Sequence, residues 1–147
     1  YRTKLGAAEI IPREVVDDRG GKPLLPSRWA GAIDSVGGNA IATIVRSAAR
    51  QGCVTACGLV SGVELTLTVH PIILRGVQLI GLDSATYPAE RRPNLWQQMS
   101  APWRPERLET LVAAQVALEE LPPQIDRILA GEVRGRVLVR PGDGPKT

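Results

Sequence analysis

Apolar and polar stretches alternate between residues 29 and 59 in a pattern that predicts a strand, a helix and a second strand. Trp29–Val36 is a short apolar run that ends in a pair of glycines, which permit the positive φ of a turn. Asn39–Arg50 carries apolar residues at the 3, 4, 7 spacing of one helical face, and Cys53–Leu59 is a second apolar run. A strand–helix–strand unit of about thirty residues is right-handed and pairs its strands in parallel. The pattern therefore predicts an α/β fold built on a parallel sheet.

A third apolar strand is predicted over Gly76–Leu82, and it ends in the polar turn Asp83-Ser84. Open α/β sheets bind ligands outside the carboxyl ends of their strands. We therefore expect the ligand-facing residues to lie in the turns that follow these strands.

The flanking parts of the chain are predicted from shorter signals. Glu9–Ile11 is expected to form a short strand, and 88–102 a helix that begins at a proline. Val112–Leu118 is expected to be extended, Pro122–Ala130 helical, and Arg136–Arg140 a final strand.

Length, charge and composition narrow the class of protein. The 147 residues suit one domain or one and a half small ones, and the net charge of +3 comes from scattered arginines. A nucleic-acid-binding protein would need a clustered basic face, so scattered arginines argue against that partner and suit an anionic small ligand. No apolar run approaches the roughly twenty residues of a membrane-spanning helix, and no signal peptide opens the chain. A cytoplasmic protein without a membrane partner is expected.

The two cysteines are not expected to pair. Cys53 and Cys57 lie four residues apart in one predicted strand, which places their Cα atoms about 13 Å apart. A disulfide requires Cα atoms about 4.4–6.8 Å apart. With a single histidine in the chain, no zinc-ligand cluster is expected either. Both cysteines are interpreted as small core residues, with Cys57 at the ligand-facing end of its strand.

Six blocks of sequence, in this order, resemble the C-terminal half of a medium-chain dehydrogenase/reductase: YRTKLGAAEIIPRE, WAGAIDSVGG, GCVTACGL, ILRGVQLIGLDS, PAERR and GEVRGRVLVRP. The subgroup they resemble is the zinc-less, quinone-oxidoreductase-like set that includes acrylyl-CoA reductase. The resemblance implies an NADPH-dependent oxidoreductase that transfers hydride to an activated alkene, such as an enoyl thioester, or to a quinone. It implies three parts: 1–107 from a Rossmann NADP-binding domain, 108–141 from the returning end of a GroES-like catalytic domain, and 142–147 as a disordered tail.

One departure from the family limits this interpretation. A dinucleotide site needs a glycine-rich turn at a helix N-terminus to hold the pyrophosphate, and the chain has no G-x-G-x-x-G or family equivalent. We therefore interpret the chain as a fragment or truncated homologue that is inactive by itself. Two alternatives stay open: a non-catalytic dimerising or nucleotide-sensing module, and a complete small α/β domain with a different anionic ligand.

The resemblance also implies two loops that contact the cofactor. The loop beside the nicotinamide ribose is matched by Cys57, Gly58 and Leu59, where glycine lets the backbone approach closely. The loop near the nicotinamide carboxamide is matched by Leu82, Asp83 and Ser84.

Four further positions are implied as cofactor contacts, each with a plain structural alternative. Arg13 matches a residue near the adenosine end, or is a solvated loop arginine. Ser35 matches a residue that touches the cofactor, and could also cap the following helix. Ile73 matches an apolar wall residue, or belongs to the core. Arg136 matches an arginine that reaches the pyrophosphate, or forms a salt bridge on the last strand.

No catalytic residue is identified. Asp34 is interpreted as structural and His70 is not expected to donate a proton, since hydride transfer in this family depends on positioning more than on acid–base chemistry. Gly76–Leu82 matches the edge strand of the family, and pairing it with its twin would satisfy exposed backbone groups. The resemblance thus implies a homodimer.

Overall fold

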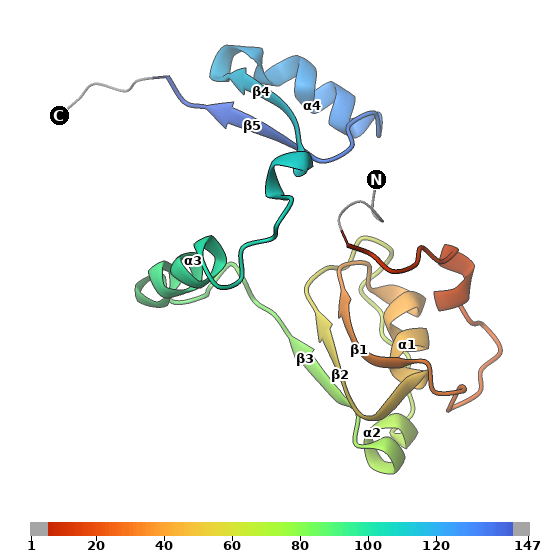
Figure 1. The fold of residues 1–147 in the computed structure, drawn as a ribbon. Coiled ribbons are helices and arrows are strands. Elements are labelled where there is room, and N and C mark those ends of the chain that lie inside the picture. The colour runs from red at the N-terminus through yellow and green to blue at the C-terminus, as the bar shows by residue number, and fades with distance from the viewer. Residues whose placement is uncertain (1–5, 143–147) are drawn as a thin grey trace. The chain divides into compact units, whose positions relative to one another are not determined.

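The computed structural model describes residues 6–142, which form two compact units (Figure 1). One unit is Ile10–Pro88, and the other contains 89–142 together with residues 6–9. No helix within the described residues is both long and apolar enough to cross a membrane. The tail predicted to be disordered, 142–147, lies outside the described residues except for residue 142.

The first unit is built on a parallel sheet of three strands, in the order β1-β2-β3. The strands are β1 (Trp29–Asp34), β2 (Ala48–Ala56) and β3 (Gln78–Gly81). Helix α1 (Gly38–Arg46) connects β1 to β2, and α2 (His70–Arg75) precedes β3. The predicted α/β architecture with a parallel sheet is confirmed.

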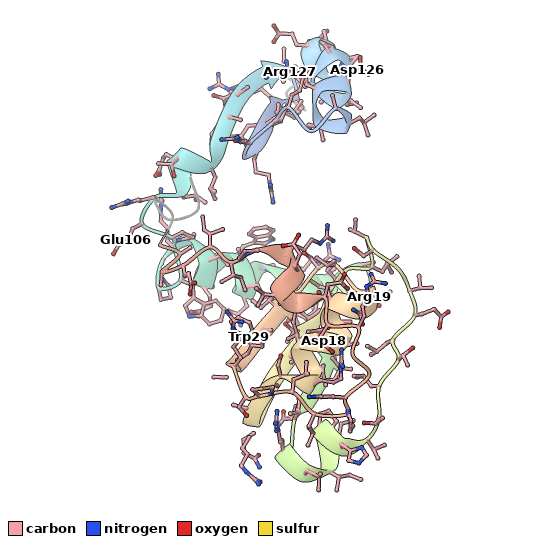
Figure 2. All side chains as sticks on the ribbon, turned by 90° about the vertical axis from the view of Figure 1, so that its right-hand side faces the viewer. Asp18, Arg19, Trp29, Glu106, Asp126 and Arg127 are labelled. Atoms are coloured by element: carbon pink, nitrogen blue, oxygen red, sulfur yellow. The ribbon has the colours of Figure 1, made fainter. Side chains whose placement is uncertain are left out.

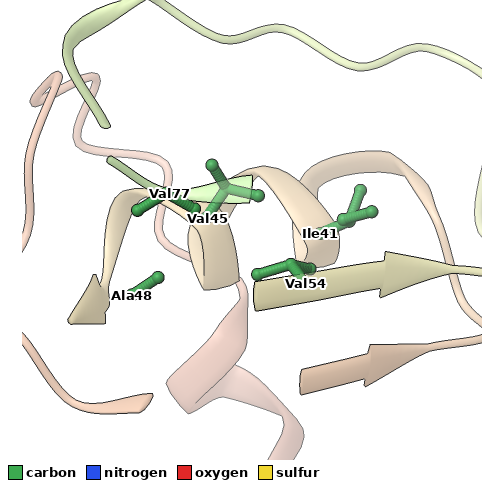
Figure 3. Close-up of a cluster of buried hydrophobic side chains, with 5 residues drawn as sticks. All are labelled: Ile41, Val45, Ala48, Val54 and Val77. Carbon is green, nitrogen blue, oxygen red and sulfur yellow. The ribbon is translucent and has the colours of Figure 1, made fainter. Parts of the chain in front are cut away.

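The core of this unit lies between α1 and one face of the sheet (Figure 3). Ile41 and Val45, one turn apart on α1, pack with Ala48, Val54 and Val77. Val45 and Val54 are fully buried, at 0% exposure each. Removing one such valine from water contributes about 1.5–3 kcal/mol, so this small cluster is a main source of the unit's stability.

The opposite face of the sheet is uncovered within the unit. The register places Ile33, Thr55 and Ile80 in one row across the strands. Because side chains alternate along a strand and Val54 faces α1, this row points the other way. Ile33 is 82% exposed and Ile80 is 42% exposed. Parallel sheets are normally covered on both faces, so the unit exposes apolar surface that a second layer would bury.

The second unit contains a smaller strand–helix–strand arrangement. Strand β4 (Val112–Ala117) pairs in parallel with β5 (Arg136–Arg140), and α4 (Leu121–Leu129) connects them. Helix α3 (Arg92–Ser100) precedes β4 in the chain. Four short 3-10 helices complete the described elements of both units: Arg13–Val16, Ala89–Arg91, Leu108–Leu111 and Leu118–Glu120.

Two sequence predictions of local structure are wrong. Glu9–Ile11 forms no strand, because none of the described strands pairs with it. The helix predicted to reach Arg50 ends at Arg46, and Ala48 already pairs with Trp29 of β1. The backbone ladder with β1 therefore outweighs the helical pattern over the last residues of the predicted helix.

Candidate functional site

The predicted ligand-facing loops begin side by side at one edge of the sheet, because all three strands run in parallel (Figure 1). The backbone N–H of Cys57 donates to the Asp34 carbonyl oxygen at 2.8 Å. The N–H of Leu82 donates to the Ala56 carbonyl oxygen at 2.9 Å. The structure thus brings together the starts of three loops, which carry Ser35, Cys57, Gly58, Leu59, Leu82, Asp83 and Ser84. Their contact with a cofactor stays a prediction.

The loop after β1 is closed by a buried carboxylate. Asp34 is 3% exposed, and its two carboxylate oxygens accept hydrogen bonds from the N–H of Val36 at 3.2 Å and of Gly37 at 2.9 Å. Gly37 has φ +74°, and a β-carbon there would lie 2.6 Å from the Gly62 carbonyl oxygen. Glycine is therefore required at this position by both conformation and space. Ser35 projects from this closed turn and is exposed.

The loop after β2 packs directly on the loop after β1. The Cys57 thiol donates to the Asp34 carbonyl oxygen at 3.2 Å. A β-carbon at Gly58 would overlap the carbonyl oxygen of Ser35. The close backbone approach expected at Gly58 is thus made by the neighbouring loop. Cys57 is exposed, so the interpretation of this cysteine as a core residue is wrong: β2 ends at Ala56 and leaves Cys57 outside the sheet.

The loop after β3 is ordered by an exposed carboxylate. Asp83 accepts hydrogen bonds from the Ala85 N–H at 3.0 Å, the Thr86 N–H at 3.2 Å and the Thr86 hydroxyl at 2.5 Å. The Thr86 hydroxyl, followed by the Thr86 and Ala85 N–H groups, holds the pKa of Asp83 below its usual value of 3.8. Asp83 is therefore ionised at neutral pH, and its carboxylate oxygens accept hydrogen bonds within its own turn.

Arg13 lies beside a cavity at the N-terminal end of α1. Its guanidinium donates to the Ser61 hydroxyl at 2.8 Å. The two residues line a cavity of about 420 Å³ that is also bordered by Asp17, Arg19 and Asn39. This contact joins the start of the unit to the segment that follows β2, while Arg13 itself is exposed, and its contact with a cofactor stays a prediction.

Ile73 and Arg136 are both exposed. Ile73 lies on α2 with 72% of its surface exposed, so its alternative interpretation as a core residue is wrong. Arg136 lies on β5 of the second unit, where its guanidinium donates to the carbonyl oxygen of Gly135 at 3.1 Å. Among the ion pairs of the described residues, none includes Arg136, so its alternative role in a salt bridge is not supported.

Sequence reasoning missed a buried arginine that holds the segment next to the cavity. The Arg46 side chain is 8% exposed and forms an ion pair with Asp18 at 2.9 Å. It also donates to the carbonyl oxygens of Asp18 at 2.7 Å and Lys22 at 3.0 Å. Figure 2 labels Asp18 and Arg19 on this segment. An arginine in the last turn of a helix is usually solvent-exposed, and no sequence signal distinguished this one.

The described groups at the sheet edge are suited to binding more than to proton transfer. The Asp83 carboxylate and the Cys57 thiol are both engaged in hydrogen bonds within the loops. The groups that could contact a ligand here include the Ser35 hydroxyl, backbone groups and apolar surface such as Leu59, which is 63% exposed. Such a surface can hold and orient a flat ligand at the ends of the strands.

Comparison with known proteins finds curated relatives that match nearly the whole chain. No family model matches the chain. YhfP of Bacillus subtilis, a protein assigned to the quinone oxidoreductases, is 41% identical over 140 residues, which are 95% of this chain and 42% of YhfP. Acrylyl-CoA reductase AcuI of Ruegeria pomeroyi is 36% identical over 139 residues, again 95% of this chain and 42% of the relative. The chain thus spans well under half the length of the curated relatives it matches.

Solved structures agree with these relatives. The crystal structure of Bacillus subtilis YhfP with NAD bound matches with a TM-score of 0.89 at 41% identity, over 95% of this chain and 42% of that one. Escherichia coli YhdH with bound NADPH matches with a TM-score of 0.79 at 40% identity, over 93% of this chain and 42% of that one. The resemblance stated from the six sequence blocks is confirmed. Nearly the whole chain is thus similar to the C-terminal part of medium-chain dehydrogenase/reductase proteins.

Proposed function

We propose that this chain is the C-terminal part of an NADPH-dependent reductase that acts on an activated alkene, such as an enoyl thioester, or on a quinone. The observation that carries the proposal is the joined edge of three loops in a chain whose fold matches NAD-bound YhfP with a TM-score of 0.89. Escherichia coli YhdH holds NADPH, and AcuI is an acrylyl-CoA reductase, which supports this cofactor and substrate class.

The proposed role of the chain's own residues is to bind and orient the cofactor. A bound nicotinamide would supply the hydride. Ser35 and the backbone of the loop Cys57–Leu59 would face its ribose, and the loop Leu82–Ser84 would orient its carboxamide. Arg13 would lie at the adenosine end, and the Arg136 guanidinium would bind the pyrophosphate as a bidentate donor. The proposed scheme includes no zinc, because hydride transfer in it depends on how the protein positions the cofactor and the substrate.

We also propose that the chain alone binds the cofactor weakly and turns nothing over. The sequence has no G-x-G-x-x-G motif, whose glycine-rich turn at a helix N-terminus is the usual holder of a pyrophosphate. The division into a Rossmann part at 1–107 and a catalytic-domain part at 108–141 belongs to the same proposal. The absence of this motif from the sequence equally favours a second candidate, a nucleotide-sensing module without catalysis.

A homodimer through Gly76–Leu82 is the proposed assembly. Among the strands that the structure describes, β3 in this segment is at the edge of its sheet and pairs on one side only, with β2. Leu79 is 36% and Ile80 42% exposed there. An edge strand of this kind is a template for pairing, and a twofold axis would join two copies of it. Sedimentation of the wild-type chain and of a Leu79→Pro variant, which cannot continue the ladder, tests this assembly.

A chimera tests the proposed activity. In it, this chain replaces the matching 42% of YhfP, so that the remaining residues come from that relative. NADPH oxidation with acrylyl-CoA or a quinone is the expected result, with the chain alone and intact YhfP as controls. A chimera that folds and binds NADPH but reduces neither substrate class would refute the reductase proposal. Tight NADPH binding by the chain alone would overturn the proposal that this chain is an incomplete part that binds the cofactor only weakly.

A further inference from the structure

Asp34 stands between two of the loops at the sheet edge and contacts both. Its carboxylate accepts the N–H groups of Val36 and Gly37, which closes the loop after β1. Its carbonyl oxygen accepts both the N–H and the thiol of Cys57, which begins the loop after β2. One residue therefore ends β1, shapes the first loop with its side chain and holds the second loop with its backbone.

The two loops also fit each other too closely to move independently. Gly58 lies against the Ser35 carbonyl oxygen with no room for a β-carbon. The Ser61 N–H donates to the Val36 carbonyl oxygen at 2.8 Å. Gly37 lies beside Leu59 and Gly62, where an added β-carbon would be 2.9 Å from the Leu59 Cα. A change in the conformation of the turn that Asp34 closes must therefore also change the conformation of the loop after β2.

We propose that Asp34 is a positioning residue that locks the loops after β1 and β2 into one unit, and so sets the surface formed by Ser35 and Cys57–Leu59. The step to cofactor affinity rests on the function proposed above, while the coupling of the loops does not. Asp34 does not touch the cofactor surface itself, since it is 3% exposed. Its effect passes through the backbone it holds.

Asp34→Asn is the sharpest perturbation, because it keeps size and removes one acceptor. Each carboxylate oxygen of Asp34 accepts a different backbone N–H, from Val36 or from Gly37. An asparagine amide offers one oxygen and one NH₂, so one backbone N–H would face another donor. The turn must open on one side. Asp126→Asn is the matched control, since Asp126 is an exposed carboxylate on α4 of the other unit.

The experiment is amide hydrogen exchange on the full chain, read by NMR, together with an NADPH titration of the same samples. Asp34→Asn is expected to speed exchange at Gly37 and also at Cys57 and Ser61 by about tenfold or more. Exchange at the core amides of Val45 and Val54 is expected to stay unchanged, and Asp126→Asn to change none of them. Where the wild type responds to NADPH at residues 35 and 57–59, the variant is expected to bind about tenfold more weakly.

Each result decides a separate point. Faster exchange at Gly37 alone, with Cys57 and Ser61 unchanged, overturns the proposal, because the loops would then be independent. Coupled exchange in a chain that shows no NADPH response supports the locked loops and agrees with the weak binding proposed for the chain alone. Coupled exchange with unaltered NADPH affinity overturns the positioning role. If Asp34→Asn does not fold, Cys57→Ala removes only the thiol contact; faster exchange at Gly37 in that variant supports the coupling, and none overturns it.

Discussion

Gly58→Ala tests the central contact of the candidate site. The substitution adds one methyl group at the point where the loop after β2 meets the loop after β1. An added β-carbon would overlap the Ser35 carbonyl oxygen and approach the Ser35 carbonyl carbon at 2.7 Å and Cα at 2.9 Å. All three are backbone atoms, so no side chain can rotate away. One of the two loops has to move.

The expected cost follows from this rigidity. Forcing an extra carbon into a packed site costs about 1–3 kcal/mol, and the absence of a flexible neighbour places Gly58→Ala toward the upper end. Gly81→Ala is the matched control, because an added β-carbon at the end of β3 has no heavy atom within 4 Å. The same chemical change there is expected to be neutral, or to stabilise by about 0.4–1 kcal/mol through the unfolded chain.

Urea unfolding followed by tryptophan fluorescence measures both variants. Trp29 lies on β1 in the same unit as both glycines, so Trp96→Phe and Trp103→Phe in all samples leave it as the only reporter. The midpoint is expected to fall for Gly58→Ala and to stay or rise for Gly81→Ala. Equal unfolding free energies for the two variants would refute the reasoning, because the loops would then have space for a side chain between them.

Three further predictions follow from burial, charge and exposure. Val54→Ala is expected to lower the free energy of unfolding by about 2–3 kcal/mol, since Val54 is fully buried against α1. Val60 is 88% exposed, so Val60→Ala should change it by less than about 0.5 kcal/mol. Equal effects of the two substitutions would contradict the assigned core. The folded pKa of Asp83 is depressed, so its contribution to stability is present above its unfolded pKa and is lost as pH falls through the lower folded value. The NMR shifts of the Thr86 and Ala85 amides should therefore change only below about pH 4. A titration midpoint of these shifts above about pH 4 would count against the turn. Ile33→Thr should reduce binding of an apolar dye to the bare sheet face without lowering the unfolding free energy by more than about 0.5 kcal/mol, because Ile33 is 82% exposed; a larger loss would mean that this face is covered.

Local sequence patterns predicted the parallel sheet well but not the ends of its elements. The apolar run from Trp29 and the helical spacing after Asn39 are signals set by neighbours in the chain, and both elements form. The end of α1 at Arg46 is set by pairing between Ala48 and Trp29, which are nineteen residues apart in the chain. The stretch of sequence from which the helical periodicity is judged does not include Trp29, the pairing partner of Ala48. The missing strand at Glu9–Ile11 has the same cause, since a strand exists only with a neighbour.

The site divides in the same way. That three loops meet at one edge follows from parallel topology, so Ser35 and Cys57 could be placed together from the sequence. The role of Asp34 could not, because its carbonyl meets Cys57 only through the register that pairs Asp34 with Ala56. Burial of Arg46 was equally hidden, since its partner Asp18 lies in an irregular segment with no period to read.

The contacts that hold the loops of the candidate site in place are different from the contacts that would cover the open face of the sheet. The contacts that fix the first two loops run between Asp34 and Gly62 and lie entirely within one unit of this chain. The apolar row through Ile33 and Ile80, by contrast, finds no cover in that unit. A second layer on that row would add stability by burying apolar surface, and it would leave the loop contacts as they are. We therefore expect loss of such a layer to lower the stability of the unit while the loops of the folded chain keep their shape, so that a weak affinity for NADPH would reflect missing contacts to its phosphates and not a disordered edge.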